Sequence, residues 1–331
     1  MNIKINLGDL SRYRTELMGI ATIMILLCHA QPFGVHLPTI LNKIFTYGNQ
    51  GVDIFLFLSG MGLYYSLEKI QDVNQLFYWY KKRYKRILIP YFIIATPFFL
   101  HSTVYYDENI WYFISLISTI SFWTDHIGAW YIAMLIPIYL FAPEIKNLCN
   151  ILNVKRFKIG GVILAMLFTI LYVIYDMGVM ECSKIVDNIF GVLSRVPSFC
   201  IGMGIAPLVK KNVEINFLYV IILSLILYSV LHHCLPDSNF PVLLAIPLLT
   251  IYILGLRYLD TKGFDMNILT FMGVISLESY LTNVFFGGFF HRINWGPLVY
   301  GNYIPYLCVI ISGICCSVVI NRCVNSVLNK E

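Results

Sequence analysis

The sequence predicts an all-α polytopic membrane protein in which about ten transmembrane helices form one bundle. Hydrophobic residues make up 58% of the 331 residues and charged residues only 12%, and the mean hydropathy is +0.73. Soluble domains carry about 25% charged residues, so this composition cannot cover a water-facing surface. The apolar runs are continuous rather than alternating, which argues against a transmembrane β-barrel.

A spanning helix needs about 20 predominantly apolar residues. The runs that meet this requirement are 15–33, 51–68, 87–104, 129–145, 159–176, 189–209, 215–233, 240–257, 268–287 and 303–323. The first run lacks a small-residue cleavage site and more spans follow it, so we interpret it as a span rather than a signal peptide. The stretch 110–122 is too short to span, which favours a re-entrant or interfacial helix. No linker or repeat interrupts the pattern, so we expect a single integral-membrane domain over residues 1–331.

The basic residues predict the orientation of the bundle. With the N-terminus in the cytoplasm, 19 of the 23 Lys and Arg residues lie in inner segments. Only Lys43, Lys184 and Arg292 lie in outer loops, and Arg195 lies within a span. Lys and Arg favour the cytoplasmic side of short loops. We therefore expect a multi-pass protein of the cytoplasmic membrane with both termini cytoplasmic.

Four ionisable residues fall at membrane depth, where each costs about 2.5–3.5 kcal/mol on insertion scales and is a functional candidate. They are His29, Asp53, Arg195 and Glu278. Each also has a structural interpretation. His29 can be an interfacial residue, Asp53 can cap the helix that follows it, and Arg195 and Glu278 can belong to ion pairs that hold helices together.

The segment 77–90 is the densest basic cluster of the chain. Its charge would attract anionic lipid head groups whatever the function. Arg83 and Arg86 are three residues apart, so on a helix they share one face. Two guanidinium groups at a membrane surface can also bind the phosphates of a large anionic ligand.

Two other classes of ligand are not expected. The net charge of +5 is too small to predict a nucleic-acid partner. The nine cysteines show no CxxC or other metal-ligand spacing. We therefore predict no metal site.

Several segments, in order along the chain, resemble the membrane-bound acyltransferase 3 family, whose members O-acylate extracytoplasmic sugars. They are RYRTELMGIATIMILLCH (12–29), YGNQGVDIFLFLSGMGLYYSL (47–67), FYWYKKRYKRILIPYFI (77–93), AWYIAMLIPIYLFAPEI (129–145), SRVPSFCIGMGIA (194–206) and SLESYLTNVFF (276–286). Two positions depart from the family pattern. Met18 stands where many relatives have Arg, and Asn283 stands where many have His. Arg14, one turn before Met18, is a candidate to supply the missing charge.

The resemblance implies an O-acyltransferase, with acetyl the expected group, that uses acyl-CoA (acetyl-CoA) as donor. Its acceptor would be a hydroxyl of a cell-envelope or exported polysaccharide, or of a lipid-linked sugar. Membrane lipids would surround the protein. Such a reaction needs a base for the acceptor hydroxyl, and His29 is the best candidate. Arg195 and Glu278 are expected to orient groups in a central cavity.

The donor is expected to bind from the cytoplasmic side. Arg83 and Arg86 are the candidate phosphate ligands, and Arg14 is expected to assist them.

Two other functions remain open from the sequence. A transporter or exporter of a lipid-linked glycan would use the buried charges along an alternating-access path, and inverted repeats with broken helices would favour it; we find none in the sequence. If the protein were instead a structural subunit of an envelope complex, its buried charges would be dispensable for function.

Overall fold

The computed structural model describes residues 4–35, 37–153, 158–179, 183–236, 238–292 and 303–328. Helices dominate this part of the chain, and one two-stranded antiparallel sheet joins β1 to β2. The elements are β1 (Lys4–Asn6), α1 (Asp9–Arg12), α2 (Arg14–Cys28), α3 (Thr39–Thr46), η1 (Tyr47–Gln50), α4 (Gly51–Leu67), α5 (Val73–Tyr105), α6 (Ile110–Ile117), α7 (Ile120–Asp125), α8 (Trp130–Leu140), α9 (Ala142–Ile151), α10 (Gly160–Ile174), η2 (Tyr175–Val179), α11 (Lys184–Leu193), α12 (Val196–Lys210), β2 (Glu214–Asn216), α13 (Phe217–Cys234), α14 (Pro241–Thr261), α15 (Asn267–Val274), α16 (Ser276–Arg292) and α17 (Tyr303–Leu328).

The all-α polytopic class is confirmed, but the predicted number of spans is not. Within the described residues, six helices are long and apolar enough to cross a membrane, or up to eight if each of two bent helix pairs is one span. The predicted spans near the N-terminus form α2 and α4, which have 15 and 17 residues and are shorter than a full span.

Two predicted spans are bent rather than straight. The run 129–145 becomes α8 and α9, which meet at 55°, and the run 268–287 becomes α15 and α16, which meet at 71°. Pro143 lies in the first turn of α9. It has no backbone N–H, and its ring clashes with the carbonyl four residues earlier, so a straight helix cannot continue through it. Gly273 and Ser276 flank the second bend, and Gly and Ser are frequent at kinks.

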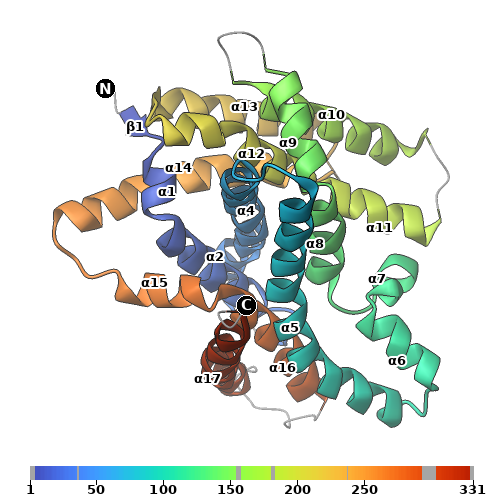
Figure 1. The fold of residues 1–331 in the computed structure, drawn as a ribbon. Helices are drawn as coiled ribbons and strands as arrows, with labels where there is room; N and C mark the ends of the chain where they lie inside the picture. The colour runs from blue at the N-terminus through green and yellow to red at the C-terminus, as the bar shows by residue number, and fades with distance from the viewer. Residues whose placement is uncertain are drawn as a thin grey trace.

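The stretch 110–122, for which we expected one re-entrant or interfacial helix, lies in two short helices, α6 and α7, of which the second continues to Asp125. Helices α6 and α7 are separated by Ser118 and Thr119, and the φ of Thr119 is 65°. This left-handed residue ends α6 and redirects the chain. Figure 1 shows both helices at one edge of the molecule, away from the central helices.

Helix α4 runs through the middle of the molecule (Figure 1). Its sequence is apolar all round, and its residues are buried on nearly every side, as expected of a helix without a polar face. Helix α13 is also apolar, but Ser224 is its single buried residue. Most of the apolar surface of α13 is therefore exposed, whereas that of α4 packs against other helices.

Glycines bring the backbones of α4, α10 and α12 into direct contact. A Cβ atom at Gly202 of α12 would lie 2.0 Å from the carbonyl oxygen of Phe57 in α4. Gly161 of α10 and Gly204 of α12 face each other, and a Cβ at either position would lie within 2.6 Å of the other's Cα. Small residues of this kind allow close helix packing in membranes. These contacts hold α12 closely against both α4 and α10.

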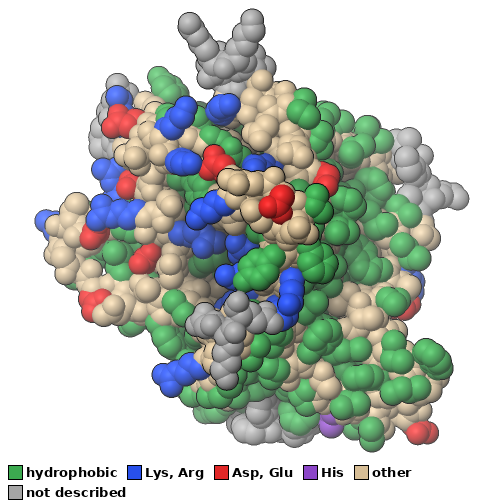
Figure 2. Space-filling model, in the orientation of Figure 1, with side chains coloured by type: hydrophobic (Ala, Val, Ile, Leu, Met, Phe, Trp, Pro, Cys, Tyr) green, Lys and Arg blue, Asp and Glu red, His purple; other side chains and the backbone are tan. Residues whose placement is uncertain are grey.

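Charged and apolar side chains separate on the surface. Figure 2 shows Lys and Arg gathered over the upper and central part of the view, where α1 and the first half of α5 lie in Figure 1, and hydrophobic side chains over the right-hand and lower parts. Exposed apolar residues are common on α10 and α13, among them Leu167, Ile170, Leu223 and Ile226. Such extended apolar faces are unusual in soluble proteins and fit a membrane protein.

The segment before α2 is tied to the end of α14. The Tyr13 hydroxyl donates a hydrogen bond of 2.7 Å to Asp260, and Arg12 donates another of 2.7 Å to the same oxygen. Burial and the hydrogen bond to Asp260 raise the pKa of Tyr13 to about 12. The hydroxyl therefore stays protonated at neutral pH and keeps donating. This contact fixes the start of α2 and with it the position of Arg14.

Candidate active site

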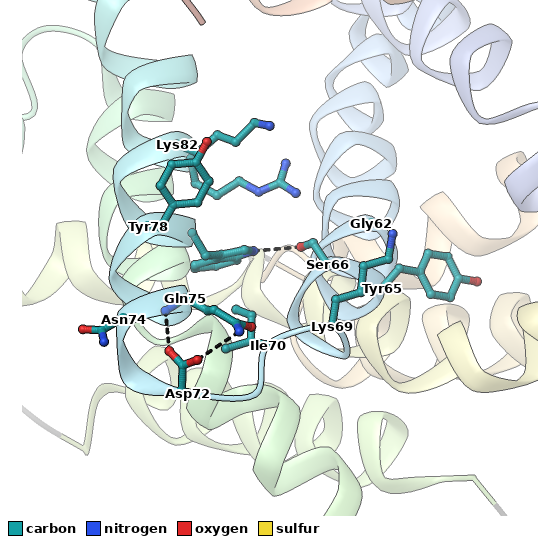
Figure 3. A pocket seen from close by; sticks show the side chains of 12 residues that line it. Gly62, Tyr65, Ser66, Lys69, Ile70, Asp72, Asn74, Gln75, Tyr78 and Lys82 are labelled. Carbon is teal, nitrogen blue, oxygen red and sulfur yellow. Dashed lines mark hydrogen bonds between the residues drawn. The ribbon is translucent and has the colours of Figure 1, made fainter. Parts of the chain in front are cut away.

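A cavity of about 720 Å³, here called the vestibule, opens between the end of α4 and the start of α5. Figure 3 shows Tyr78 and Lys82 on α5 facing Gly62, Ser66 and Lys69 of the α4 segment. Asp72 caps α5 by accepting from the Gln75 backbone N–H at 2.8 Å. The Trp79 indole N–H donates to Ser66 Oγ at 2.9 Å (Figure 3). The vestibule thus combines aromatic rings with basic side chains.

A second cavity of about 370 Å³, here called the central cavity, lies deeper in the bundle. Six helices line it: α2, α4, α5, α8, α15 and α16. Arg14, Arg83 and Arg86 all line it, and so does Met18. The three arginines that the sequence nominated as donor ligands therefore meet at one cavity, although Arg14 lies about 70 residues away from the other two.

Arg83 and Gly62 line both cavities, so the vestibule and the central cavity adjoin there. The guanidinium of Arg83 lies 5.9 Å from the centre of the Trp79 ring. A Cβ at position 62 would lie 2.9 Å from Arg14 Nη2. The missing side chain of Gly62 therefore leaves room for the Arg14 guanidinium at the junction.

Arg86 forms an ion pair with Glu278, the first-turn acid of α16. A second contact joins Arg86 Nη2 and Glu278 Oε2 at 3.5 Å. Glu278 is fully buried, and a buried carboxylate requires such a partner. The cavity carries three guanidinium groups against this one carboxylate, which leaves an excess of positive charge. The site is suited to an anion.

His29 lies at the opposite end of α2 from Arg14, about 20 Å along the helix axis at 1.5 Å per residue. Its Nδ1 is 2.6 Å from Asn283 Oδ1. Asn283 Nδ2 donates to the Tyr306 hydroxyl at 3.3 Å, and that hydroxyl donates to the backbone carbonyl of Leu26. Helices α2, α16 and α17 therefore meet at one hydrogen-bond chain.

The direction of this chain fixes the tautomer of His29. Tyr306 gives its only proton to the Leu26 carbonyl, so its oxygen must accept from the Asn283 amide. The amide oxygen of Asn283 then faces His29 and requires a donor. His29 Nδ1 consequently carries the proton, and Nε2 keeps its lone pair. A histidine held in this way is arranged to act as a base.

Tyr280 lies between the two halves of the site. Its ring lines the central cavity, and the ring centres of Tyr280 and His29 are 6.2 Å apart. Tyr131, at the start of α8, also lines the cavity and packs edge-on against Tyr280 with ring centres 4.9 Å apart. His29 itself is not among the described residues that line the cavity. Tyr280 thus separates the arginines from the imidazole.

Asp53 and Arg195 form a buried ion pair beside this region. Ser198 Oγ donates to the second Asp53 oxygen at 2.8 Å, and Arg195 also donates to the Asn49 carbonyl at 3.3 Å. The Arg195 guanidinium lies 5.8 Å from the centre of the Trp130 ring. Trp130 precedes Tyr131, so the pair supports the start of α8 rather than lining the central cavity.

The structure thus places the sequence-nominated residues in two groups. Arg14, Arg83 and Arg86 line the central cavity, Glu278 is joined to it through its ion pair with Arg86, and His29 lies behind Tyr280. Arg195 pairs with Asp53 outside the lining. Sequence reasoning missed Tyr280 and gave Asn283 no role. The run of polar residues at 278–283 within an apolar span was the available signal.

The fold is that of a helical membrane protein, and the polar cavity between its helices is typical of an enzyme's binding site. The family model described as an acyltransferase domain matches residues 17–322. The chain therefore belongs to the acyltransferase 3 family, and it is a membrane acyltransferase that transfers groups other than aminoacyl groups. No curated protein and no solved structure matches it significantly.

Proposed function

We propose that this acyltransferase moves an acyl group, with acetyl the expected one, from acyl-CoA to a hydroxyl of a cell-envelope or exported polysaccharide. One observation carries the proposal: a cavity rich in arginine ends at Tyr280, whose other side faces a histidine with a free Nε2. An anionic donor suits the first half of this arrangement, and deprotonation of an alcohol suits the second.

The donor half of the proposal rests on charge and shape. The nucleotide end of acyl-CoA carries phosphates and an adenine ring. Lys69, Lys82 and Arg83 supply positive charge in the vestibule, and Tyr78 and Trp79 supply aromatic faces on which a base can stack. The thioester arm would extend past Gly62 into the central cavity. Arg14 and Arg86 would pair with any phosphate of the donor that lies in the central cavity.

The transfer itself uses His29 as general base. Nε2 removes the proton of the acceptor hydroxyl while the alcohol oxygen attacks the thioester carbonyl carbon. The tetrahedral intermediate collapses, the carbon–sulfur bond breaks, and the coenzyme leaves as a thiolate that takes the proton from the imidazolium. The products are an ester and free CoA. Asn283 keeps the ring oriented throughout by accepting from Nδ1.

The direct test is acyl transfer by purified protein. We expect wild-type protein in detergent, given radiolabelled acetyl-CoA and candidate glycans, to label a glycan. His29→Gln keeps polarity and approximate size, so it should be expressed normally and should still bind CoA. Loss of a general base lowers turnover by about 10²–10⁴-fold. A well-expressed His29→Gln variant that acylates like the wild type would remove His29 from the mechanism.

The donor site has a separate test. Arg83→Ala with Arg86→Ala should weaken CoA binding in calorimetry without preventing membrane insertion, because both side chains line the central cavity. Arg83→Ala alone, which leaves the Arg86–Glu278 pair intact, should also weaken binding. Lys81→Ala is the matched control, because Lys81 is on the same helix but lines neither cavity. Equal affinity in all four proteins would mean that the cluster serves lipids or orientation only.

A further inference from the structure

The Tyr280 hydroxyl is a buried donor without a partner. Five buried side-chain atoms make no hydrogen bond within the described part of the chain: Asp9 Oδ2, Glu16 Oε2, Gln50 Oε1, Ser279 Oγ and Tyr280 Oη. Of these residues, only Tyr280 lines the central cavity. Its side chain is 3% exposed. An unsatisfied buried hydroxyl costs stability, and this one lies at the edge of a cavity, where a bound ligand can accept its proton in a hydrogen bond.

The N-terminal end of α8 points toward the Tyr280 hydroxyl. No side chain caps this helix, and the first backbone N–H groups of a helix have no partner inside it. The backbone N–H of Tyr131, in that first turn, lies near the Tyr280 oxygen. The positive end of the α8 dipole therefore adds to the hydroxyl in favouring negative charge at this point.

The position also suits the reaction. Tyr280 lies between the two groups that the reaction needs. It lines the cavity that would hold the thioester arm, and it packs near the ring of His29. A carbonyl attacked by an alcohol that His29 deprotonates must lie close to that ring. The oxygen of the carbonyl then becomes negatively charged, and a water-excluded donor stabilises it most strongly.

We propose that Tyr280 is a catalytic residue whose hydroxyl donates a hydrogen bond to the thioester carbonyl and to the oxyanion formed from it. This assignment rests on the acyl-CoA reaction proposed above. The hydroxyl keeps its proton throughout; it stabilises the tetrahedral oxyanion, and the bond to the carbonyl oxygen persists in the ester product until that product leaves.

The test is Tyr280→Phe, which keeps the ring and removes only the hydroxyl. Loss of one oxyanion donor lowers kcat by about 10²–10³-fold, and we expect this with unchanged affinity for CoA. The thermal midpoint should change little, because the hydroxyl donates to no described partner and only its contact with the Tyr131 N–H is lost. In infrared spectra of bound ¹³C-labelled acetyl-CoA, the carbonyl band should move to higher frequency in the variant.

Tyr91→Phe is the matched control. Tyr91 is 1% exposed on α5, and its hydroxyl donates to the carbonyls of Leu116 and Ile117 at 3.2 Å each. Its variant should lower the thermal midpoint and leave kcat unchanged. A Tyr280→Phe variant with wild-type kcat and an unmoved carbonyl band would overturn the assignment and leave the proposed function standing. A wild-type protein that transfers nothing from acyl-CoA would overturn both.

Discussion

Asn283 shows how one amide can determine the chemistry of a histidine. The hydrogen-bond chain from Leu26 through Tyr306 fixes which amide atom faces His29. The amide therefore selects the tautomer with a free Nε2. A histidine at this position would have to accept the same bond with a ring nitrogen, whereas in this chain the acceptor is an amide oxygen, which does not titrate.

We expect Asn283→Leu to lower kcat by about 10- to 100-fold, the equivalent of about 1–3 kcal/mol for a lost orienting hydrogen bond. CoA affinity should not change, because Asn283 does not line the central cavity. Turnover and calorimetric binding measure the two effects. Asn188→Leu is the control, because Asn188 makes a similar 2.6 Å contact with His126 far from the site. Equal losses of kcat in both variants would contradict a specific role for Asn283.

Asp53 and Arg195 form a buried ion pair in which each charge is tolerated only because the other neutralises it. We expect Arg195→Met to destabilise the protein by about 3–5 kcal/mol, because it leaves Asp53 as an uncompensated buried charge. Asp53→Asn combined with Arg195→Met should recover most of this loss. Thermal unfolding in detergent measures the difference.

The exposed pair Lys210–Glu68, at 2.8 Å, provides the comparison. Lys210→Met should change the thermal midpoint little, because exposed ion pairs contribute little. If the Asp53 and Arg195 substitutions destabilise additively, the two side chains are not coupled as the structure indicates.

Sequence reasoning at this scale found the charged residues but not their partners. His29, Arg195 and Glu278 stand out because ionisable groups are rare in apolar runs. Their partners lie far along the chain: Arg86 and Glu278 are separated by 192 residues, and Asp53 and Arg195 by 142. No spacing rule connects such positions, so the pairing emerged only from the fold.

The helices themselves were largely predictable, and their breaks were not. Apolar length located the helical segments, because only continuous backbone hydrogen bonding is tolerated in a bilayer. The bends at 55° and 71° could not be inferred from hydropathy. Irregular backbone at membrane depth is tolerated where it lines a cavity, and Gly273, Val274 and Ser276 at the second bend do line the central cavity.

The close packing of α4 against α12 predicts that a larger residue at Gly202 destabilises the protein. Gly202→Ala would place a Cβ 2.0 Å from the Phe57 carbonyl, so the helices would have to separate. Overpacking of this kind costs about 1–3 kcal/mol, and we expect a lower thermal midpoint. Gly255→Ala in α14 is the control, because a methyl group at that position would meet no described atom within 4 Å. A Gly202→Ala variant as stable as Gly255→Ala would contradict the packing.

The orientation of the whole molecule stays a prediction from the 19 inner and 3 outer basic residues. On a Cys-less background, we expect Lys82→Cys, in the vestibule, to react with a membrane-impermeant thiol reagent only from the cytoplasmic side. Lys43→Cys, on α3, should react only from outside. Labelling of Lys82→Cys from outside would reverse the orientation and with it the side from which the donor enters.

The glycine contacts also decide which parts of the molecule can move. Where α4, α10 and α12 touch, backbone lies against backbone, and no side-chain rotamers can rearrange to let them slide. The pairs α8–α9 and α15–α16 are bent at a break in the helix instead, and both pairs contribute to the central cavity. Hinge motions concentrate at such element ends. We therefore expect the motions that open and close the central cavity to come from the bent pairs, moving against the close-packed helices α4, α10 and α12.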